Sequence, residues 1–336
     1  MKINVLRINL LITIFLMLCH TSTAQSDTPI YLLLKGNSSG SLLAGAGTQG
    51  LVHILDTNTG EIIFDLSLFE TTSIWALAWS PDGKYLAFGS FESDIFIYCT
   101  DETATADCAF GTLVANWNAQ TEDLLDLDWN PDSTQIVVAS QDALRSLSIW
   151  DINDQELLGY VTGLGVNDVD WSPDGRWIAY ANVDTGVAYI DAQTIQPNGA
   201  IPSVHLLGNL LDATSVAWNH TSTRLAVGEG SIVSSYNAPI RISIWEVGQD
   251  EPLLILEGHT SIIENIEWNS RDNYLASVSF DTQIIVWDAV TGEILATYQS
   301  PDDGFITLMG ITWVGDSNSI AYGMSPPSIV KPSNHD

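Results

Sequence analysis

The sequence predicts an all-β protein of the β-propeller class, in which small sheets repeat around a ring, and three observations lead to this prediction. A phrase of strand, Trp-led turn and strand recurs every 42 to 50 residues. Each recurrence divides into four short strands separated by turns rich in Gly, Asp, Asn and Ser. No stretch beyond the N-terminal region has helical apolar spacing. Four-stranded units with a period of about 40–45 residues are typical of propeller blades.

The N-terminal residues have the pattern of a targeting segment. Lys2 and Arg7 flank the start of an apolar run at residues 8–19, and small residues at a cleavage-like site end at Ala24. The run is shorter than the roughly 20 residues that a membrane-spanning helix needs. We therefore expect residues 1–24 to be a signal peptide and residues 25–336 to form one exported domain, extracellular or periplasmic. A retained signal anchor is the alternative.

The charge balance excludes some classes of partner. The chain has 41 acidic residues against 10 Lys and Arg, a formal net charge of −31. Nucleic acid and anionic membrane surfaces are disfavoured, because both are bound through clustered Lys and Arg. The chain is nevertheless not of the disordered class, since 46% of its residues are hydrophobic and twelve are Trp. A protein partner with basic patches would complement this charge.

The repeat phrases give the number of blades. The Trp residues that lead the turns are Trp79, Trp129, Trp171, Trp218, Trp268 and Trp313. A weaker copy, YLLLKGNSSGSLLAGAG, places Lys35 at the Trp position. Seven copies predict seven four-stranded blades. The last blade should be incomplete, because the Pro residues near the C-terminus leave room only for a short third strand at residues 328–331. A chain that is cut short would also leave the last blade with too few strands. The alternative is a six-bladed ring whose C-terminal strands complete the first unit.

One unit carries a more specific pattern. Gly258 and His259 open it, and its second strand contains Ser277; the other residues of the pattern are Asp281 in the next turn and Trp287-Asp288 at the end of the third strand. On these residues the chain resembles the WD-repeat family of propellers, and the resemblance extends from Tyr31 to about Met324. The endings Trp150-Asp151 and Trp245-Glu246 are similar, while the other units match mainly in period and turns.

The resemblance implies a buried polar network in this unit. In that network Asp281 accepts from His259, the ring of His259 meets the Ser277 hydroxyl, and Ser277 meets the Trp287 indole N–H. Such a network satisfies buried polar groups and fixes the register of the strands. His259 is therefore expected to be structural rather than catalytic.

The sequence contains no specific catalytic motif. It lacks the nucleophile elbow, the zinc-protease helix, the phosphate loop and the dinucleotide fingerprint. We expect a non-catalytic protein-interaction platform, monomeric and without a cofactor or metal ligand set. The alternatives are a lactonase-like hydrolase and a cation-binding propeller with acids in its channel. The acids expected near the channel are Asp126, Asp128, Asp168, Asp170, Glu264 and Glu267. Oxygen ligands suit calcium, but local hydrogen bonds to the backbone are the competing interpretation.

Cysteine usage agrees with export. Once the N-terminal segment is removed, only Cys99 and Cys108 remain. An oxidising compartment would allow a disulfide between them.

The WD-repeat resemblance also implies a docking surface. In that family partners usually dock on the narrower face, formed by the starts of the inner strands and the turns between second and third strands. The candidate rim residues on this face are Tyr31, Trp75, Phe91, Asn167, Tyr236, Glu264 and Phe280. Large aromatic residues at an exposed rim often carry binding energy. The alternative is that the aromatic residues pack between blades.

Overall fold

The structure is a computed structural model that describes residues 31–330, apart from 48–49, 68–72, 102–107, 122, 164, 183–185, 200–203, 208–212, 231–238, 300–309, 315–318 and 324–327. The expected signal peptide and the candidate rim residue Tyr236 lie outside the described residues. Within the described part of the chain, no helix has the length and apolar character needed to cross a membrane.

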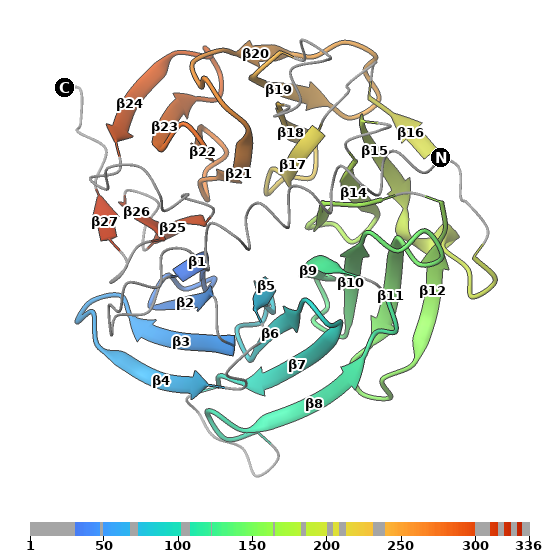
Figure 1. Ribbon diagram of the computed structural model, residues 1–336. Helices are drawn as coiled ribbons and strands as arrows, with labels where there is room; N and C mark the ends of the chain where they lie inside the picture. The colour runs from blue at the N-terminus through green and yellow to red at the C-terminus, as the bar shows by residue number, and fades with distance from the viewer. Residues whose placement is uncertain are drawn as a thin grey trace.

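The described strands form seven antiparallel sheets, each made of consecutive strands. Figure 1 shows them in chain order around a central axis, from blue β1 to red β27. Blades 1 and 2 comprise β1 (Tyr31–Gly36), β2 (Leu42–Gly47), β3 (Leu51–Asp56), β4 (Ile62–Ser67), β5 (Ile74–Trp79), β6 (Tyr85–Ser90), β7 (Asp94–Cys99) and β8 (Leu113–Asn118). Blades 3 and 4 comprise β9 (Leu124–Trp129), β10 (Gln135–Ser140), β11 (Leu147–Asp151), β12 (Leu157–Val161), β13 (Asp168–Trp171), β14 (Trp177–Asn182), β15 (Gly186–Asp191) and β16 (Val204–Leu206). Blades 5 and 6 comprise β17 (Ala213–Trp218), β18 (Arg224–Glu229), β19 (Arg241–Glu246), β20 (Leu254–Leu256), β21 (Ile263–Trp268), β22 (Tyr274–Ser279), β23 (Gln283–Asp288) and β24 (Ile294–Gln299). The last sheet comprises β25 (Ile311–Val314), β26 (Ser319–Tyr322) and β27 (Ser328–Val330).

In the part of the chain that the structure describes, the last sheet limits the number of four-stranded blades to six, where the repeat count predicted seven blades with an incomplete last one. The described residues form six four-stranded blades, the number in the alternative count, and β25–β27 form a three-stranded sheet. These C-terminal strands do not extend blade 1 but form a separate sheet whose inner strand contacts β1. Pro326, Pro327 and Pro332 flank β27 in the sequence. Because Pro cannot donate to a strand ladder, little of this segment is suited to a longer strand.

Burial explains why the strands alternate less clearly near the axis than at the outside. In the second strand of blade 3, β10, five of six residues are buried, since adjacent blades cover both of its faces. In the outer strand β8, Ala115 is buried and Trp117 partly buried while the other four residues are exposed, because only one face packs on the blade. The sequence pattern therefore predicts the outer strands by alternation and the inner ones by continuous apolar runs.

At four blade junctions, the Trp at the end of an inner strand joins its blade to the preceding one. The indole N–H of Trp79 donates to the Lys35 carbonyl at 2.8 Å, and that of Trp129 donates to the Ala78 carbonyl at 3.1 Å. Two later blade junctions repeat the contact through Trp268 and Trp313. At these four junctions the Trp is thus both a core residue and a hydrogen-bonded tie between inner strands, whereas the indole N–H of Trp171 donates to the Gly175 carbonyl of its own turn at 3.1 Å.

This contact corrects the alignment of the first repeat. The Trp of one blade donates to the residue before the turn Trp of the preceding blade, as with Trp129 and Ala78. Lys35 therefore occupies the position of Ala78, and Gly36, not Lys35, occupies the Trp position. The strand pairing agrees, because Gly36 lies opposite Leu43 as Trp79 lies opposite Leu86.

Close backbone approaches mark the junction between the last sheet and blade 1. A Cβ at Gly310 would lie 2.5 Å from the Leu34 nitrogen, and one at Gly323 would lie 2.6 Å from the Tyr31 carbonyl oxygen. The Gly36 N–H donates to Thr312 Oγ1 at 3.0 Å across the same junction. Glycine is needed here because the two inner strands leave no room for side chains.

Candidate functional site

The structure brings together the four residues of the polar network expected in blade 6. His259 Nε2 lies 2.8 Å from Ser277 Oγ, and the Trp287 indole N–H donates to the same hydroxyl at 2.9 Å. On the other side of the ring, His259 Nδ1 lies 3.0 Å from Asp281 Oδ2. These hydrogen bonds link β22, β23 and the segment before β21. They hold the pKa of Asp281 below its ordinary value despite its partial burial.

Two other blades contain a different version of this network, which the sequence reasoning missed. In blades 3 and 5 the Trp indole N–H donates at 2.9 Å to a Ser two residues earlier on the same strand, in the pairs Trp150–Ser148 and Trp245–Ser243. In blade 5 the hydroxyl of Ser243 then donates to Glu229, a buried carboxylate. The spacing Ser-x-Trp, which recurs in the third strands of both blades, could have predicted these hydrogen bonds from the sequence.

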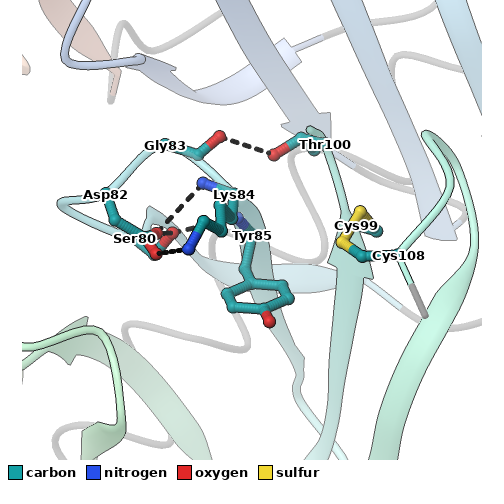
Figure 2. The surroundings of a disulfide bond; sticks show 8 residues. All are labelled: Ser80, Asp82, Gly83, Lys84, Tyr85, Cys99, Thr100 and Cys108. Atoms are coloured by element: carbon teal, nitrogen blue, oxygen red, sulfur yellow. Dashed lines mark hydrogen bonds and ion pairs between the residues drawn. A yellow bond between two sulfur atoms is a disulfide. The ribbon is translucent and has the colours of Figure 1, made fainter. Parts of the chain in front are cut away.

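The two remaining cysteines lie at the outer side of blade 2. Cys99 ends β7 and is disulfide-bonded to Cys108, with the two Cα atoms 5.5 Å apart. Figure 2 shows the bond beside the Ser80–Tyr85 turn, where the Thr100 hydroxyl donates to the Gly83 carbonyl at 3.2 Å. Both cysteines are buried, so the bond is part of the packing of this hairpin.

The inner strands place side chains on the channel wall at two levels. The lower level is formed by the residues directly before the turn position, and the upper level by the residues two positions earlier. The lower level comprises Lys35, Ala78, Asp128, Asp170, Ala217, Glu267 and Thr312, and the upper level includes Asp126, Asp168, Ser215 and Asn265. The two levels are about 6–7 Å apart, because a strand rises about 3.4 Å per residue.

The channel aspartates bind backbone groups, but across blades rather than locally. Asp126 Oδ2 accepts the N–H of Val169 at 3.1 Å, and Asp128 Oδ2 accepts the N–H of Trp171 at 2.8 Å. The same contacts recur from blade 4 to blade 5, where Asp168 accepts the Val216 N–H at 2.7 Å and Asp170 accepts the Trp218 N–H. Four carboxyl groups therefore form a ladder that joins blades 3, 4 and 5.

Burial raises the pKa of every carboxyl group in this ladder. The pKa of Asp128 and that of Asp168 rise to about 6, and those of Asp126 and Asp170 rise well above the ordinary value. A second cause for Asp126 is the neighbouring charge of Asp168, with which it is hydrogen-bonded, and Asp128 acts in the same way on Asp170. A hydrogen bond between two carboxyl groups needs a proton, so the two members of each pair share one proton when that bond is formed.

Two glutamates and one lysine complete the charged groups near the channel. Burial raises the pKa of Glu264 to about 8 and that of Glu267 to about 7. Burial alone would lower the pKa of Lys35, but the carboxyl groups around it, with Glu267 the strongest, raise it above its ordinary value. Lys35 thus remains a cation on an otherwise acidic wall.

The candidate rim residues do not form one cluster. Trp75 lies at the bulge of β5 and is partly exposed, with its ring centroid 5.7 Å from that of Phe91 in the next turn of the same blade. Asn167 of blade 4 accepts a hydrogen bond from Gln141 at 2.6 Å. Glu264 and Phe280 of blade 6 are partly exposed. The structure therefore brings Trp75 and Phe91 together.

Tyr31 is a correction among the candidate rim residues. Its side chain is 3% exposed and packs over Gly45, while its hydroxyl contacts His53. Tyr31 was placed on the rim because Lys35, instead of Gly36, was aligned with the turn Trp. A shift of one residue in a strand moves its side chains to the opposite face. Sequence reasoning also missed Leu144, which is 74% exposed in the turn between β10 and β11.

Comparison with known families agrees with the repeat analysis. A family model described as WD domain, G-beta repeat matches residues 250–288, which include the polar network of blade 6. A second model, described as eukaryotic translation initiation factor eIF2A, matches residues 48–185.

Curated proteins with similar sequences include several WD-repeat proteins. The WD repeat-containing protein WDS homolog of Arabidopsis thaliana is 23% identical over 289 residues, which cover 75% of this chain and 54% of the relative. The F-box-like/WD repeat-containing protein TBL1X of Mus musculus is 25% identical over 204 residues, covering 59% of this chain and 36% of the relative. Protein HIR2 of Debaryomyces hansenii is 24% identical over 258 residues, covering 71% of this chain and 26% of the relative. The chain therefore spans between about a quarter and a half of the length of these relatives. With the ring of consecutive four-stranded sheets and the polar network of blade 6, these matches make the chain similar to WD-repeat β-propeller proteins and support that family for it.

Proposed function

We propose that this protein is an exported, non-catalytic platform that docks a protein partner on the face formed by the turns between second and third strands. WD-repeat propellers typically act as interaction scaffolds, which supports the general class. The observation that favours this face is the contact between Trp75 and Phe91, two partly exposed aromatic rings at its edge. Partly exposed aromatic residues can supply large apolar contact area to a partner.

Two further residues of the same kind lie in equivalent turns. Phe280 opens the turn between β22 and β23, as Phe91 opens the turn between β6 and β7, and Leu144 projects from the turn of blade 3. These apolar side chains stand on a chain with a net charge of −31. A partner with basic patches around an apolar contact would suit both features, and the charges would act mainly on the association rate.

Export is supported by the N-terminal sequence and by the pairing of Cys99 with Cys108. A buried disulfide is compatible with an oxidising compartment. The matching test is to express the full chain with a C-terminal tag and to sequence the N-terminus of the exported form. A mature N-terminus near Gln25 supports the proposal, and an uncleaved chain retained in the membrane contradicts it.

Docking is tested by substituting the aromatic residues. Trp75→Ala and Phe280→Ala should reduce capture of the partner from the exported fraction about tenfold, while the melting temperature stays close to that of the parent protein. Val290→Ala is the matched control, because Val290 is 66% exposed in a turn between third and fourth strands, on the opposite face. Loss of capture that follows loss of stability would place the two aromatic residues in the core and the docking surface elsewhere.

A further inference from the structure

The lower end of the channel contains a cavity that the docking proposal does not use. Its volume is about 270 Å³, and its wall includes Lys35, Asp128, Asp170 and Glu267. It also reaches His220, whose side chain is 53% exposed in the turn after β17. Turns between first and second strands lie on the face opposite the candidate rim, so the cavity is open to solvent at that face.

The wall carries more acidic than basic groups. On it, the carboxyl groups of Asp126, Asp128, Asp168, Asp170 and Glu267 accompany one ammonium group, that of Lys35. Among the described residues Lys35 forms no close ion pair with them and acts on them through space. Even with one proton shared in each Asp pair, the negative charge exceeds the positive charge of Lys35. The cavity therefore favours a further cation.

Independent of the Asp pairs, two acceptor atoms and one donor on this wall are buried without a hydrogen-bond partner among the described residues. The acceptors are Glu267 Oε2 and Asn265 Oδ1, the donor is the indole N–H of Trp218, and all three residues line the cavity. The other carboxylate oxygen of Glu267 accepts from the Thr312 hydroxyl at 3.1 Å, which fixes the side chain and leaves Oε2 available. Buried acceptors are normally satisfied, so two unsatisfied acceptors beside one cavity indicate a missing donor.

The arrangement of these groups argues against a bare metal ion. Within the described residues, no group of three or more His, Cys, Asp or Glu side chains is placed to hold one. The acceptors instead occur at two levels of the channel, about 6–7 Å apart along the strands. Two donor groups joined by a short apolar chain would match such a spacing.

We propose that the channel cavity binds a linear aliphatic diamine, with one ammonium group among Asp128, Asp170 and Glu267 and the other near Asp126, Asp168 and Asn265. An ammonium group offers three donors and therefore satisfies several oxygen acceptors at once. The hydrocarbon chain between the two nitrogens lies along the narrow wall between the levels. This site is separate from the candidate rim, so either proposal can fail without the other.

Binding should depend on pH because the ligand replaces shared protons. The charged groups that face the site are Lys35 from β1, the Asp pairs of β9 and β13, Glu267 from β21, and His220 beside β17. As pH rises through the range from about 6 to 7, the carboxyl groups of Asp128, Asp168 and Glu267 lose their protons. Lys35 stays charged, since its pKa is raised. The affinity for a dication should therefore increase over this range, with protons released on binding.

The experiment is isothermal titration calorimetry of the purified exported chain with 1,4-diaminobutane at pH 6 and pH 8. The proposal predicts one saturable site, at least fivefold tighter at pH 8, with a heat that varies with the ionisation enthalpy of the buffer. Butylamine, which has one ammonium group, and magnesium chloride should each bind at least tenfold more weakly. These two ligands separate a diamine site from a general attraction for cations.

Variants connect the binding to the cavity. Asp128→Asn should weaken diamine binding at least tenfold, Lys35→Met should strengthen it severalfold, and the exposed-residue control Glu251→Gln should leave it unchanged. Circular dichroism and melting temperature confirm that each variant is folded. If Asp128→Asn does not fold, Lys35→Met still tests the proposal. Removing the ammonium group of Lys35 should increase the affinity for the diamine, whereas Asp128→Asn should decrease it. Absence of saturable binding to the folded parent chain, equal binding of butylamine, or unchanged affinity in both channel variants would overturn the proposal.

Discussion

The carboxylate of Asp128 accepts the backbone N–H of Trp171 at 2.8 Å, and this bond joins blade 3 to blade 4 at the wall of the channel. Asp128 is also hydrogen-bonded with Asp170, which makes the equivalent contact from blade 4 to blade 5. The side chains that make the channel acidic are therefore the same ones that hold its inner strands together. Stability and channel charge are coupled as a result.

The first prediction concerns pH. The folded-state pKa values of the ladder and of Glu264 and Glu267 are raised above the unfolded values of about 4. The native state therefore binds more protons than the unfolded state between about pH 4 and pH 8, and the free energy of unfolding decreases as pH rises through that window. We expect a higher melting temperature at pH 5 than at pH 8.

The matched variant is Asp126→Asn combined with Asp170→Asn. Asn imitates the protonated carboxyl group, so this double variant should have a flatter pH profile than the parent. A parent melting temperature that rises steadily from pH 5 to pH 8 would contradict the assignment of these pKa values.

The second prediction concerns the polar network of blade 6. Ser277→Ala removes the hydroxyl that joins the ring of His259 to the Trp287 indole, so it leaves buried groups without partners. The free energy of unfolding should fall by about 1–3 kcal/mol. His259→Ala should have a similar effect, and Trp287→Ala a larger one because it also leaves a cavity. Chemical denaturation measures these changes, and unchanged midpoints for all three would show that the network contributes nothing to stability.

The third prediction concerns the disulfide. The bond closes a short loop, with a sequence separation of 9. In the chain-entropy model a loop of about ten residues corresponds to roughly 2–3 kcal/mol of stabilisation. We expect the double variant Cys99→Ser, Cys108→Ser to unfold at correspondingly lower denaturant concentration. The exported parent protein, unfolded without reductant, should show no free thiols; two thiols per chain would contradict the pairing.

The fourth prediction concerns the junction of the last sheet with blade 1. Gly310→Ala would place a Cβ 2.5 Å from the Leu34 nitrogen, a backbone atom that cannot move aside. Its cost should exceed that of Gly60→Ala, where φ is +73° but no atom lies within 4 Å of the added Cβ. The control should lose about 1–2 kcal/mol from backbone strain. If Gly310→Ala is no worse than this control, the two inner strands are less closely joined than the structure indicates.

The sequence predicts the repeat and the class of fold well, because the turn Trp and the strand alternation are local signals. It predicts the first repeat less well. Lys35 was aligned with the turn Trp because the short repeat YLLLKG ends in Gly36, which has no side chain to mark the position. That shift placed Tyr31 on the candidate rim, whereas its side chain is buried over Gly45.

The contacts between blades were also beyond the reach of the sequence. Asp126 was correctly expected on the inner strand, but its acceptor role toward Val169 depends on how consecutive blades pack. Local motifs contain no information about that packing. The Ser148–Trp150 pair shows the opposite case, because its S-x-W spacing is local and could have been recognised.

Site-specific photo-crosslinking tests the central claim, that the protein is an exported docking platform, most directly. A photoreactive amino acid is introduced at Phe280 on the proposed docking face and, in a separate chain, at Val290 on the opposite face. The account predicts one dominant cross-linked protein at position 280 in the exported fraction, weakened by Trp75→Ala and absent at position 290. Equal cross-linking at both positions, or none at position 280 from a folded and exported chain, would contradict it.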